Sequence, residues 1–389
     1  MEQKKKKTIA VIISILIIFL GVLFAAGIFF HADERLKDIF ASEKTASETN
    51  QNEDIQKEPD FTEEIAEESV EEETVPDTTI VITGDVELSN AVLNNYNNKG
   101  IEGVVSGELL SELQNADVLE INNEFCFSER GEQAPDKQFT FRVNPSYVSV
   151  LTDMGVDVAG LANNHVLDFG KDALTDTFTT LSDAGIEYTG AGTSHEDASK
   201  LVIKEVNGKK YGFLAASRVI PVGSWNVDNS QPGVFTCYDT TALCNSITAA
   251  KQQVDYLFVC VHWGVEHTDE LTDYQVANGH AYIDAGADAV IGSHPHVLQG
   301  MEYYNGKPIF YSLGNFIFNE NINSTMAVKF TFTPEGEVSM NLLPATATGA
   351  TTSMAGADKA ASIYAYLQSL SSTVFVGSEG EISEASLVP

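Results

Sequence analysis

The sequence predicts a mixed α/β domain over residues 78–375, and three observations support that class. Short stretches rich in Val, Ile and Thr alternate along the chain with longer stretches of helical periodicity. The dipeptides Asn207-Gly208, Asn305-Gly306 and Glu335-Gly336 each separate two strand-like stretches, as expected of hairpin turns. The segment is also long enough to bury the core of one large domain or two small ones. Because hairpins are inserted among alternating strands and helices, we expect both parallel and antiparallel pairing.

The elements can be placed in chain order from residue 78. The first strand, 78–83, is a β-branched stretch that ends at Gly84 and Asp85. Five further strands are short apolar stretches: 117–121, 156–161, 186–189, 256–261 and 287–291. Five helices have apolar residues at helical spacing: 106–115, 145–154, 171–184, 273–285 and 357–370. Three hairpins complete the domain: 200–217, 301–313 and 328–343. Residues 376–389 are small, polar and acidic, and we expect a loose C-terminal tail there.

The net charge of −34 is distributed unevenly along the chain. Residues 1–7 carry four Lys and one Glu, residues 8–30 carry no charge, and residues 31–77 carry 17 acidic and 4 basic side chains. The remainder, 78–389, therefore carries a net charge of −24. Because only Lys4–Lys7 form a basic cluster, the composition argues against a nucleic-acid-binding protein.

Residues 8–30 are predicted to form one transmembrane helix. The uncharged stretch is long enough to cross a bilayer core at about 1.5 Å per residue. A cleaved signal peptide would have a shorter apolar region and a small-residue cleavage site, which the sequence around Phe29 and Phe30 does not offer. The basic residues 1–7 precede the span, so we expect a single-pass cell-membrane protein with a cytoplasmic N-terminus and an extracytoplasmic main domain.

Residues 31–77 are predicted to be an acidic, disordered linker. The run from Glu63 to Glu73 has few large apolar neighbours and cannot bury enough surface to fold. The linker would therefore act as a self-repelling tether between the membrane and the domain.

Polar side chains follow five of the predicted strands at the point where each strand ends. They are Gly84-Asp85, Asn122 to Glu124, Asn163 to His165, His262 to Glu266, and Gly292 to His296. Because ligands in open α/β sheets bind at the carboxyl ends of strands, we expect these five ends to converge on one site. Carboxylates, an amide and several imidazoles are typical of a divalent metal pair. Such a pair would clamp a phosphoryl group and deprotonate a bridging water.

Each cluster alone has an ordinary structural explanation. An Asp after Gly at a strand end is most often a turn or a helix cap, and an Asn-Asn pair usually forms a turn. Isolated histidines such as His195 and His280 are expected to be packed or exposed rather than ligands. The X-Pro step between His294 and His296 directs the two imidazoles in a defined way. Five polar clusters at five strand ends favour one metal site over five unrelated turns.

Five sequence motifs resemble those of the poly-γ-glutamate capsule biosynthesis family, CapA. They are VITGDVEL around Asp85, LANNHVLDFG around His165, VHWGVEH around His262, IGSHPHVLQG and YSLGNFIF. Together with PDKQFTFRVNP they lie in the family's order over residues 79–318. This family is similar to the calcineurin-like metallophosphoesterases. The resemblance implies a four-layer sandwich of two mixed β-sheets flanked by helices.

The resemblance also implies roles for individual residues. It implies metal ligands at six positions: Asp85, Glu124, Asn164, His262, His294 and His296. It places at His165 the histidine that protonates a leaving group, and an imidazole can change charge near pH 7. Asn163 is expected to contact substrate.

Two further residues near these motifs have alternative interpretations. Glu266 could orient a ligand or substrate and is a second catalytic candidate, or it could be a solvated loop carboxylate. Arg142 could bind an anionic group of the substrate, or it could form a surface ion pair.

The first motif departs from the phosphoesterase pattern. Those enzymes have Asp-x-His at the first strand end, and this chain has Asp85, Val86 and Glu87. Glu87 could replace the imidazole, since side chains two residues apart on a strand point the same way, or it could face solvent. The second motif has Glu124 where the pattern has Asp. We expect two divalent ions among Mn, Mg, Fe and Zn, and an oxygen-richer site favours Mn or Mg over Zn.

The four cysteines add little to the site. Outside the membrane Cys237 and Cys244 could form a disulfide, although their spacing does not establish it. Cys260 lies in an apolar strand and is expected to pack in the core, and Cys126 is not expected to be a ligand.

Three functions follow from these observations. The first is a metal-dependent phosphoesterase outside the cell, and the second is a membrane-anchored role in poly-γ-glutamate capsule synthesis or export, with other membrane subunits of a polymer synthase as partners. The third, a receptor that only binds the polymer, is disfavoured because an acidic domain repels polyglutamate unless divalent cations bridge the two. The sequence contains no nucleotide-binding glycine loop, which argues against ATP-driven ligation in this chain.

Overall fold

The computed structural model describes residues 75–228, 231–318 and 320–385. The predicted anchor at 8–30, the basic residues before it and the linker up to residue 74 lie outside the described residues. Within the described part of the chain, no helix is both long and apolar enough to cross a membrane. The architecture below concerns the described residues alone.

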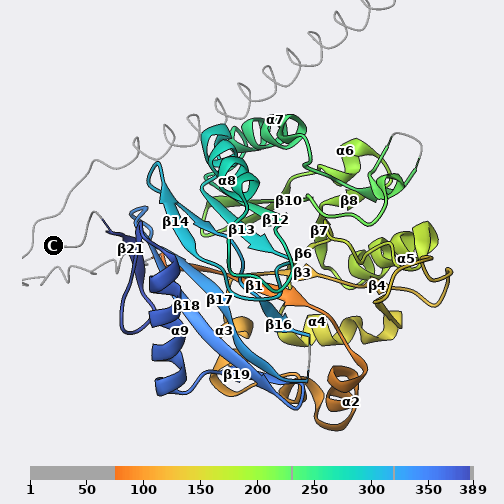
Figure 1. Cartoon of the computed structure of the whole chain (residues 1–389), viewed down its shortest axis with the longest axis horizontal. Helices are drawn as coiled ribbons and strands as arrows, with labels where there is room; N and C mark the ends of the chain where they lie inside the picture. Colours follow the sequence, from red (N-terminus) through yellow and green to blue (C-terminus); the bar gives the residue numbers. More distant parts are fainter. Residues whose placement is uncertain (1–74, 229–230, 319, 386–389) are drawn as a thin grey trace, which may run out of the picture. The chain divides into compact units, whose positions relative to one another are not determined.

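The larger of two main sheets has nine strands and mixed pairing (Figure 1). Its path runs β2-β19-β18-β17-β1-β3-β6-β7, and β16 also pairs with β1. The pairs β1–β3, β3–β6 and β6–β7 are parallel, whereas β17 pairs antiparallel with both β1 and β18. The strands are β1 (Thr78–Val86), β2 (Val105–Ser106), β3 (Val118–Asn123), β6 (Val158–Gly160), β7 (Glu187–Thr189), β16 (Asn315–Ile317), β17 (Ile322–Phe332), β18 (Val338–Thr348) and β19 (Thr351–Met354).

The second main sheet has six strands in the order β14-β15-β13-β12-β10-β9. Three of its pairs are parallel and two are antiparallel hairpins. The strands are β9 (Val202–Val206), β10 (Lys209–Ser217), β12 (Tyr256–His262), β13 (Ala289–Ser293), β14 (Met301–Tyr304) and β15 (Lys307–Phe310). Three two-stranded ribbons accompany the sheets: β4 (Cys126–Phe127) with β5 (Arg142–Val143), β8 (Ala191–Gly192) with β11 (Gly233–Val234), and β20 (Val374–Val376) with β21 (Ile382–Glu384).

Helices cover the outer faces of both sheets (Figure 1). The α-helices of the described residues are α2 (Asn90–Lys99), α3 (Gly107–Gln114), α4 (Val148–Met154), α5 (Gly170–Asp183), α6 (His195–Ala198), α7 (Thr240–Lys251), α8 (Asp273–Ala285) and α9 (Ala357–Leu370). Short 3-10 turns occur at Gly100–Gly103, Pro145–Tyr147 and Gly223–Trp225. The predicted helices 273–285 and 357–370 match α8 and α9 to the residue.

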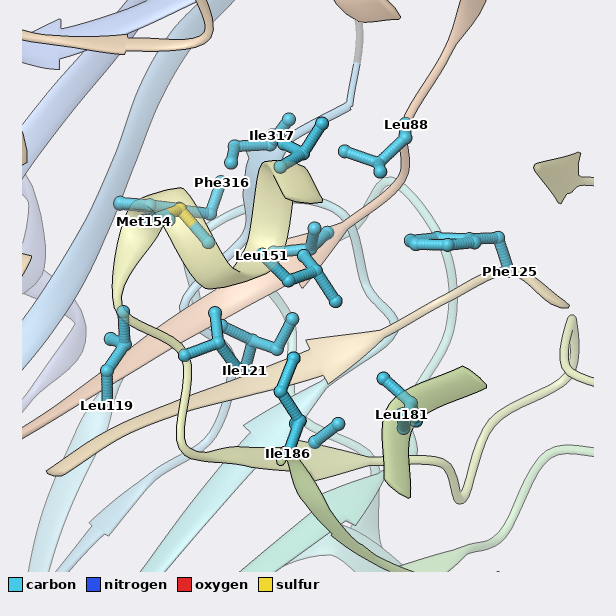
Figure 2. Packing of buried hydrophobic residues seen from close by; sticks show 14 of the residues in the cluster. Leu88, Leu119, Ile121, Phe125, Leu151, Met154, Leu181, Ile186, Phe316 and Ile317 are labelled. Atoms are coloured by element: carbon cyan, nitrogen blue, oxygen red, sulfur yellow. The ribbon is translucent and has the colours of Figure 1, made fainter. Parts of the chain in front are cut away.

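Three apolar cores define the layers. One lies between the two sheets, where Ile82 of β1 and Phe258 of β12 share a cluster. A second joins the six-stranded sheet to α7 and α8, and it includes Ile247 and Tyr282. The third joins the nine-stranded sheet to α3, α4 and α5. Figure 2 shows this third core, in which Leu151 of α4 lies among side chains of β3 and α5. The layer order is therefore helices, sheet, sheet, helices, and the predicted mixed α/β class is confirmed.

The two Asn-Gly hairpins form as the sequence predicts. Asn207 and Gly208 have φ of 51° and 76°, and Asn305 and Gly306 have φ of 50° and 72°. A two-residue type I′ turn needs positive φ at both positions, which Asn and Gly tolerate best. The hairpins β9–β10 and β14–β15 supply both outer edges of the six-stranded sheet.

The prediction of a loose tail from residue 376 is wrong for residues 376–385. Strand β21 pairs with β20, and Leu342 of β18 donates a backbone hydrogen bond to Gly380. Ile382 is buried with α9 in the core between the sheets. The small and polar composition concealed a short strand that covers one end of that core.

The predicted alternative of a Cys237–Cys244 disulfide is not realised, because both cysteines are free thiols. Cys237 is buried beside Tyr282, and burial raises the pKa of its thiol to about 11. Cys126 and Cys260 are free as well.

Candidate metal centre

The candidate site lies where the parallel strands of both sheets end. Asp85 is on β1, Glu124 follows β3, Asn164 follows β6, His262 ends β12, and His294 follows β13. These carboxyl ends meet because β1, β3 and β6 are parallel neighbours in one sheet, and β12 and β13 are parallel neighbours in the other. Convergence of this kind is the general rule for ligand sites in α/β proteins.

Glycine at position 84 allows the first strand to reach the site. A Cβ there would lie 2.0 Å from the backbone oxygen of Gly314, so only glycine permits this approach. Asp85 then donates its backbone N–H to that same oxygen at 2.9 Å. The Gly-Asp pair of the first motif therefore fixes the Asp85 carboxylate against the loop that leads to β16.

The Asp85 carboxylate is fully buried and has three polar neighbours. Its Oδ1 accepts a hydrogen bond from Asn122 Nδ2 at 2.7 Å. Its Oδ2 accepts from the backbone N–H of His294 at 3.3 Å and lies 3.2 Å from Nδ1 of His296. Asp85 thus connects strand ends of the two sheets.

Glu124 is the least satisfied polar side chain of the site. It is fully buried, and within the described residues neither of its carboxylate oxygens has a hydrogen-bond partner. Its Oε1 lies 3.6 Å from His262 Nε2, 3.9 Å from His165 Nε2 and 4.0 Å from His296 Nε2. Burial, reinforced by the nearby Asp85, raises the pKa of Glu124 well above its usual range. A bare buried carboxylate is costly unless a cation compensates it.

With His294, four imidazoles lie close to the Glu124 carboxylate. His262 is buried, with Nδ1 3.0 Å from Ser293 Oγ and Nε2 2.8 Å from Asn164 Oδ1. His294 is buried too, and its Nδ1 has no hydrogen-bond partner among the described residues. Burial lowers the pKa of His262 well below its usual value and that of His294 to about 3. Neutral imidazole is the form that binds metals, and His294 in addition has a ring nitrogen without a partner among the described residues.

His296 differs from His262 and His294. Its Nδ1 lies 2.7 Å from Asn315 Oδ1 and 3.2 Å from Asp85 Oδ2. Burial acts to lower the pKa of His296, but the Glu124 and Asp85 carboxylates outweigh burial and raise it to about 10. His294 and His296 also have positive φ, 96° and 61°, which non-glycine residues adopt rarely. This strained loop directs both rings towards the carboxylates.

Three combinations of these side chains can hold a metal ion, because each offers ligand atoms within 4.8 Å of one another. They are Glu124 with His262 and His294, Glu266 with His294 and His296, and Asp85 with Glu124 and His296. Five of the six predicted ligands occur in these groups, and the sixth, Asn164, contacts His262 directly. The shared members are consistent with two adjacent ions.

His165 belongs to a polar chain beside the metal groups. Its Nδ1 lies 2.7 Å from Asp168 Oδ2, and the ring stacks on Phe141 with centroids 4.4 Å apart. Lys137 Nζ forms an ion pair with Asp168 Oδ1 and lies 2.9 Å from His165 Nδ1. Burial lowers the pKa of His165, and the Asp168 contact opposes that shift. The ring is held in one orientation, with its Nε2 side towards Glu124.

A cavity of about 670 Å³, here called the Arg142 cavity, opens onto the centre. His165, His296, Glu266 and Arg142 line it, and so does Glu87. Glu87 is 6% exposed, and burial raises its pKa to about 8, so the alternative of a solvent-facing side chain is wrong. Glu87 nevertheless belongs to none of the three metal groups.

The two residues with alternative interpretations both reach the cavity. Glu266 is half exposed, yet it forms a metal group with His294 and His296. Arg142 Nη1 donates to the backbone oxygens of Arg130 and Gly131 at 3.0 and 3.3 Å. Its guanidinium also lies 4.1 Å from the ring centroid of Phe169. These contacts position Arg142 on the wall without an acidic partner of its own among the described residues.

Asn163 does not face the cavity. It is fully buried, and its Nδ2 donates to Asn122 Oδ1 at 3.1 Å and to the Asn123 backbone oxygen at 2.9 Å. Its Oδ1 accepts from the backbone N–H of His165 at 3.0 Å. Asn163 therefore holds the loop that carries His165, and the geometry does not support the predicted substrate contact.

The sequence predicted no individual role for five residues of the site: Asn122, Lys137, Asp168, Ser293 and Asn315. All five lie in the polar clusters or motifs that predict the site, and this position is the one signal that could have found them. Their importance follows from contacts between segments far apart in the chain. Asp168, for instance, follows His165 by one turn but meets Lys137 from another loop.

Comparisons with known proteins agree with the motifs. Residues 79–320 match the model of a family described as bacterial capsule synthesis protein PGA_cap. The chain belongs to this family.

Several curated relatives are similar to the chain. The PGA biosynthesis protein CapA of Bacillus subtilis (strain 168) is 36% identical over 204 residues, which cover 52% of this chain and 53% of that protein. The capsule biosynthesis protein CapA of Bacillus anthracis is 31% identical over 251 residues, covering 63% and 60%. A probable polyglutamine synthesis accessory protein of Mycobacterium tuberculosis (strain CDC 1551 / Oshkosh) is 35% identical over 222 residues, covering 54% and 58%. The chain thus spans about half to three fifths of the length of these relatives.

A solved 5'-nucleotidase from Candida albicans SC5314 is also similar in structure. It aligns with 69% of this chain and 52% of its own, at 10% identity and a TM-score of 0.38. A similarity this low carries no argument about the fold or the activity.

The donor set of this PGA_cap member fits divalent cations. Two carboxylate oxygens of Glu124 and one ring nitrogen of His294 are buried without partners among the described residues, and they face one another across the centre. Carboxylate and imidazole donors suit Mn, Mg, Fe or Zn alike, with the oxygen-rich Asp85–Glu124 side suited to the harder ions. No Cys belongs to the three groups.

Proposed function

We propose that the domain binds divalent metal ions through Asp85, Glu124, Asn164, His262, His294 and His296, and that it takes part in the synthesis or export of a poly-γ-glutamate capsule. The capsule role is drawn from family membership and from the names of the relatives. The metal role is carried by one observation: the buried Glu124 carboxylate has no partner among the described residues, although ring nitrogens of His165, His262 and His296 lie 3.6–4.0 Å from its Oε1.

A hydrolytic step at this centre is a second proposal, supported by His165. A site that only bound a polymer would not need an imidazole held by Asp168 at 2.7 Å beside the metal groups. Divalent ions there would polarise a bound phosphoryl group and make water a better nucleophile. His165 would hold or supply the proton for the leaving group at Nε2, and Arg142 would orient an anionic part of the substrate in the cavity. The alternative substrate is a phosphoester of the cell envelope unrelated to the capsule.

The hydrolytic proposal is tested with the purified chain, Mn²⁺ and bis(p-nitrophenyl) phosphate. We expect turnover by the natural sequence and a loss of about two orders of magnitude or more in His165→Ala with its metal content unchanged. His195→Ala, an exposed histidine on α6, is the matched control and should keep its activity. Unchanged turnover in His165→Ala would remove the enzymatic role.

The capsule proposal is tested in cells that make the polymer. The double variant His262→Ala and His294→Ala removes two imidazoles of one metal group, so we expect capsule output to fall to the level of a deletion strain. Full output from this variant, at normal protein abundance, would contradict a metal-dependent role in assembly.

We further propose that residues 8–30 anchor the chain in the cell membrane, with the N-terminus in the cytoplasm. Its partners in the membrane would be other subunits of a polymer synthase. The support is the uncharged stretch, the basic residues before it and the acidic segment after it. A membrane-impermeant maleimide should label Ser42→Cys in intact cells and Gln3→Cys only after permeabilisation. The reverse pattern would contradict the orientation.

A further inference from the structure

A second cavity adjoins the metal centre. It has a volume of about 480 Å³ and shares His296 and Asn315 with the Arg142 cavity. Its other polar wall residues come from α9, from the start of β17 and from the residue just before that strand: Lys359, Ser362, Tyr366, Asn323, Ser324 and Asn321. We call it the Lys359 cavity. The two cavities therefore meet at His296 and Asn315, beside the metal groups.

The charged side chain that lines the Lys359 cavity is basic, whereas the chain as a whole is strongly acidic. The chain carries a net charge of −34, yet among the described residues no carboxylate lines this cavity. Its wall offers one ammonium group, several amides and several hydroxyls, above a floor that includes the buried Ile363. The Arg142 cavity, in contrast, is lined by Glu87, Glu266 and Glu320 as well as Arg142. An anionic group next to the metal centre would therefore meet least repulsion in the Lys359 cavity.

The walls of the Lys359 cavity are held in place. Lys359 is half-buried, and its Nζ donates to Asn323 Oδ1 at 3.1 Å, which connects α9 to β17. Tyr366 Oη donates to Asp269 Oδ2 at 2.6 Å, which connects α9 to the loop before α8. Leu367 is buried in the core between the sheets and fixes the helix face. The ammonium group is therefore positioned before any ligand arrives, which lowers the entropy cost of binding.

We propose that the two cavities are consecutive binding sites for one extended anionic chain. The chain would pass over His296 and Asn315, with one segment in the Arg142 cavity and the next in the Lys359 cavity. There Lys359 would bind a side-chain carboxylate, and Asn321, Asn323 and the hydroxyls would bind backbone amides. This inference rests on the proposed capsule function and adds to it a place on the domain, the Lys359 cavity, where an interior stretch of a carboxylate-bearing amide polymer would bind.

The two cavities together offer room for more than one repeat unit of a chain. Pockets for compact ligands occupy about 300–1,000 Å³, and each of these two cavities reaches that range separately. A single repeat unit would fill only part of one cavity and would leave Lys359 unused. A chain that spans both cavities gains contacts with each added unit until both are filled.

The test uses the full chain with Mn²⁺ and fluorescent γ-linked glutamate oligomers from dimer to octamer. We expect affinity to rise with length and then level off. Lys359→Gln should weaken octamer binding about three- to fivefold, as for a partly exposed charge pair, and should leave the dimer unchanged. Lys359→Arg should restore the affinity. The matched control is Lys210→Gln. Lys210 is exposed at the N-terminal end of β10 and lines neither cavity, so its replacement should have no effect.

The outcomes separate this inference from the function on which it rests. Binding that is independent of length, an equal effect of Lys359→Gln and Lys210→Gln, or no binding at all would overturn it. The metal-dependent function is judged by phosphodiester turnover and by the capsule output of the His262→Ala and His294→Ala double variant, both measured with the Lys359 cavity unchanged. Tighter binding of a polyphosphate of matched charge would overturn the assignment to carboxylates.

Discussion

The carboxyl group of Glu120 provides a quantitative test of the fold. Glu120 is on β3, is 2% exposed and points between the two sheets, where it faces Cys260 of β12. Gly160 of β6 leaves room for it, because a Cβ there would lie 3.1 Å from Glu120 Oε1. Burial raises the pKa of Glu120 to about 8 from 4.5. We consider the substitution Glu120→Gln, which keeps the shape of the side chain and removes its ionisable carboxyl group.

Proton binding by Glu120 determines whether the free energy of unfolding rises or falls with pH. Between pH 4.5 and about 8 the folded state keeps the proton of Glu120 and the unfolded state loses it, so the folded state binds more protons. The free energy of unfolding therefore falls as pH rises, by about 1.4 kcal/mol per pH unit, or about 3 kcal/mol from pH 5 to pH 7. Burial also raises the pKa of the Cys260 thiol, which stays neutral over this range. In Glu120→Gln this contribution to the slope should vanish.

The assay is urea unfolding of the full chain at several pH values, followed by the fluorescence of the buried Trp263. Other groups also titrate, so the measured quantity is the difference in slope between the natural sequence and Glu120→Gln. Glu335→Gln, an exposed carboxylate in the β17–β18 turn, is the control and should keep the natural slope. Equal slopes in all three proteins would refute the assignment of a neutral buried carboxyl to Glu120.

Three further predictions concern the site and its support. Gly292→Ala should lower the free energy of unfolding in urea by about 3 kcal/mol or more, because the new Cβ would lie 2.0 Å from the Tyr311 backbone oxygen. Gly306→Ala is the control: its Cβ would meet no atom within 4 Å, but φ is 72°, so the loss should be about 1–2 kcal/mol. Equal losses in the two variants would contradict the packing argument. Asp168→Asn should lower phosphodiester turnover about 10–100-fold at unchanged metal content, since it weakens the contact that orients His165; unchanged turnover would make Asp168 purely structural. Saturating Mn²⁺ at about 100 times its Kd should add about 2.7 kcal/mol to the free energy of unfolding, and Glu124→Gln should abolish that gain; a gain that survives in this variant would place the metal elsewhere.

The elements that could be predicted from the sequence are those with explicit boundaries. Helix α8 has the predicted bounds, and the structure shows what marks them: Thr272 and Gln275 form a capping box at its start, and Gly286 follows its last turn. Helix α2 was missed because its many Asn residues are poor helix formers; its N-terminus is capped by Ser89. Strand β16 was missed because three residues between loops carry no periodicity, and it forms only by pairing with β1.

The site residues that could be predicted are those placed by the carboxyl ends of parallel strands. Asp85 and Glu124 come together because the parallel pairing of β1 with β3 places them at one edge of the nine-stranded sheet, and His262 at the end of β12 in the other sheet meets Glu124 there. What the sequence does not contain is the direction of neighbouring side chains within a loop. Asn163 and Asn164 are adjacent and chemically identical, yet the first is used entirely by backbone and amide contacts and the second meets His262. The same reason hid Lys137, whose partner Asp168 lies on a different loop.

The distribution of charge decides how an acidic domain could handle an acidic polymer. At the centre, Asp85, Glu124 and Glu266 would repel a polyanion until cations neutralise them, so polymer binding should depend on metal binding. Beside the centre, the proposed contact of the polymer with Lys359 would not depend on metal. Raising salt should weaken the contact at half-buried Lys359 more than the contacts at the buried centre, because exposed charge pairs are screened more strongly. In Mn²⁺, long oligomers bound to the natural chain should therefore lose their affinity advantage over the dimer when the salt concentration is raised. At low salt, removing the metal from the Lys359→Gln variant should make long oligomers bind as weakly as the dimer.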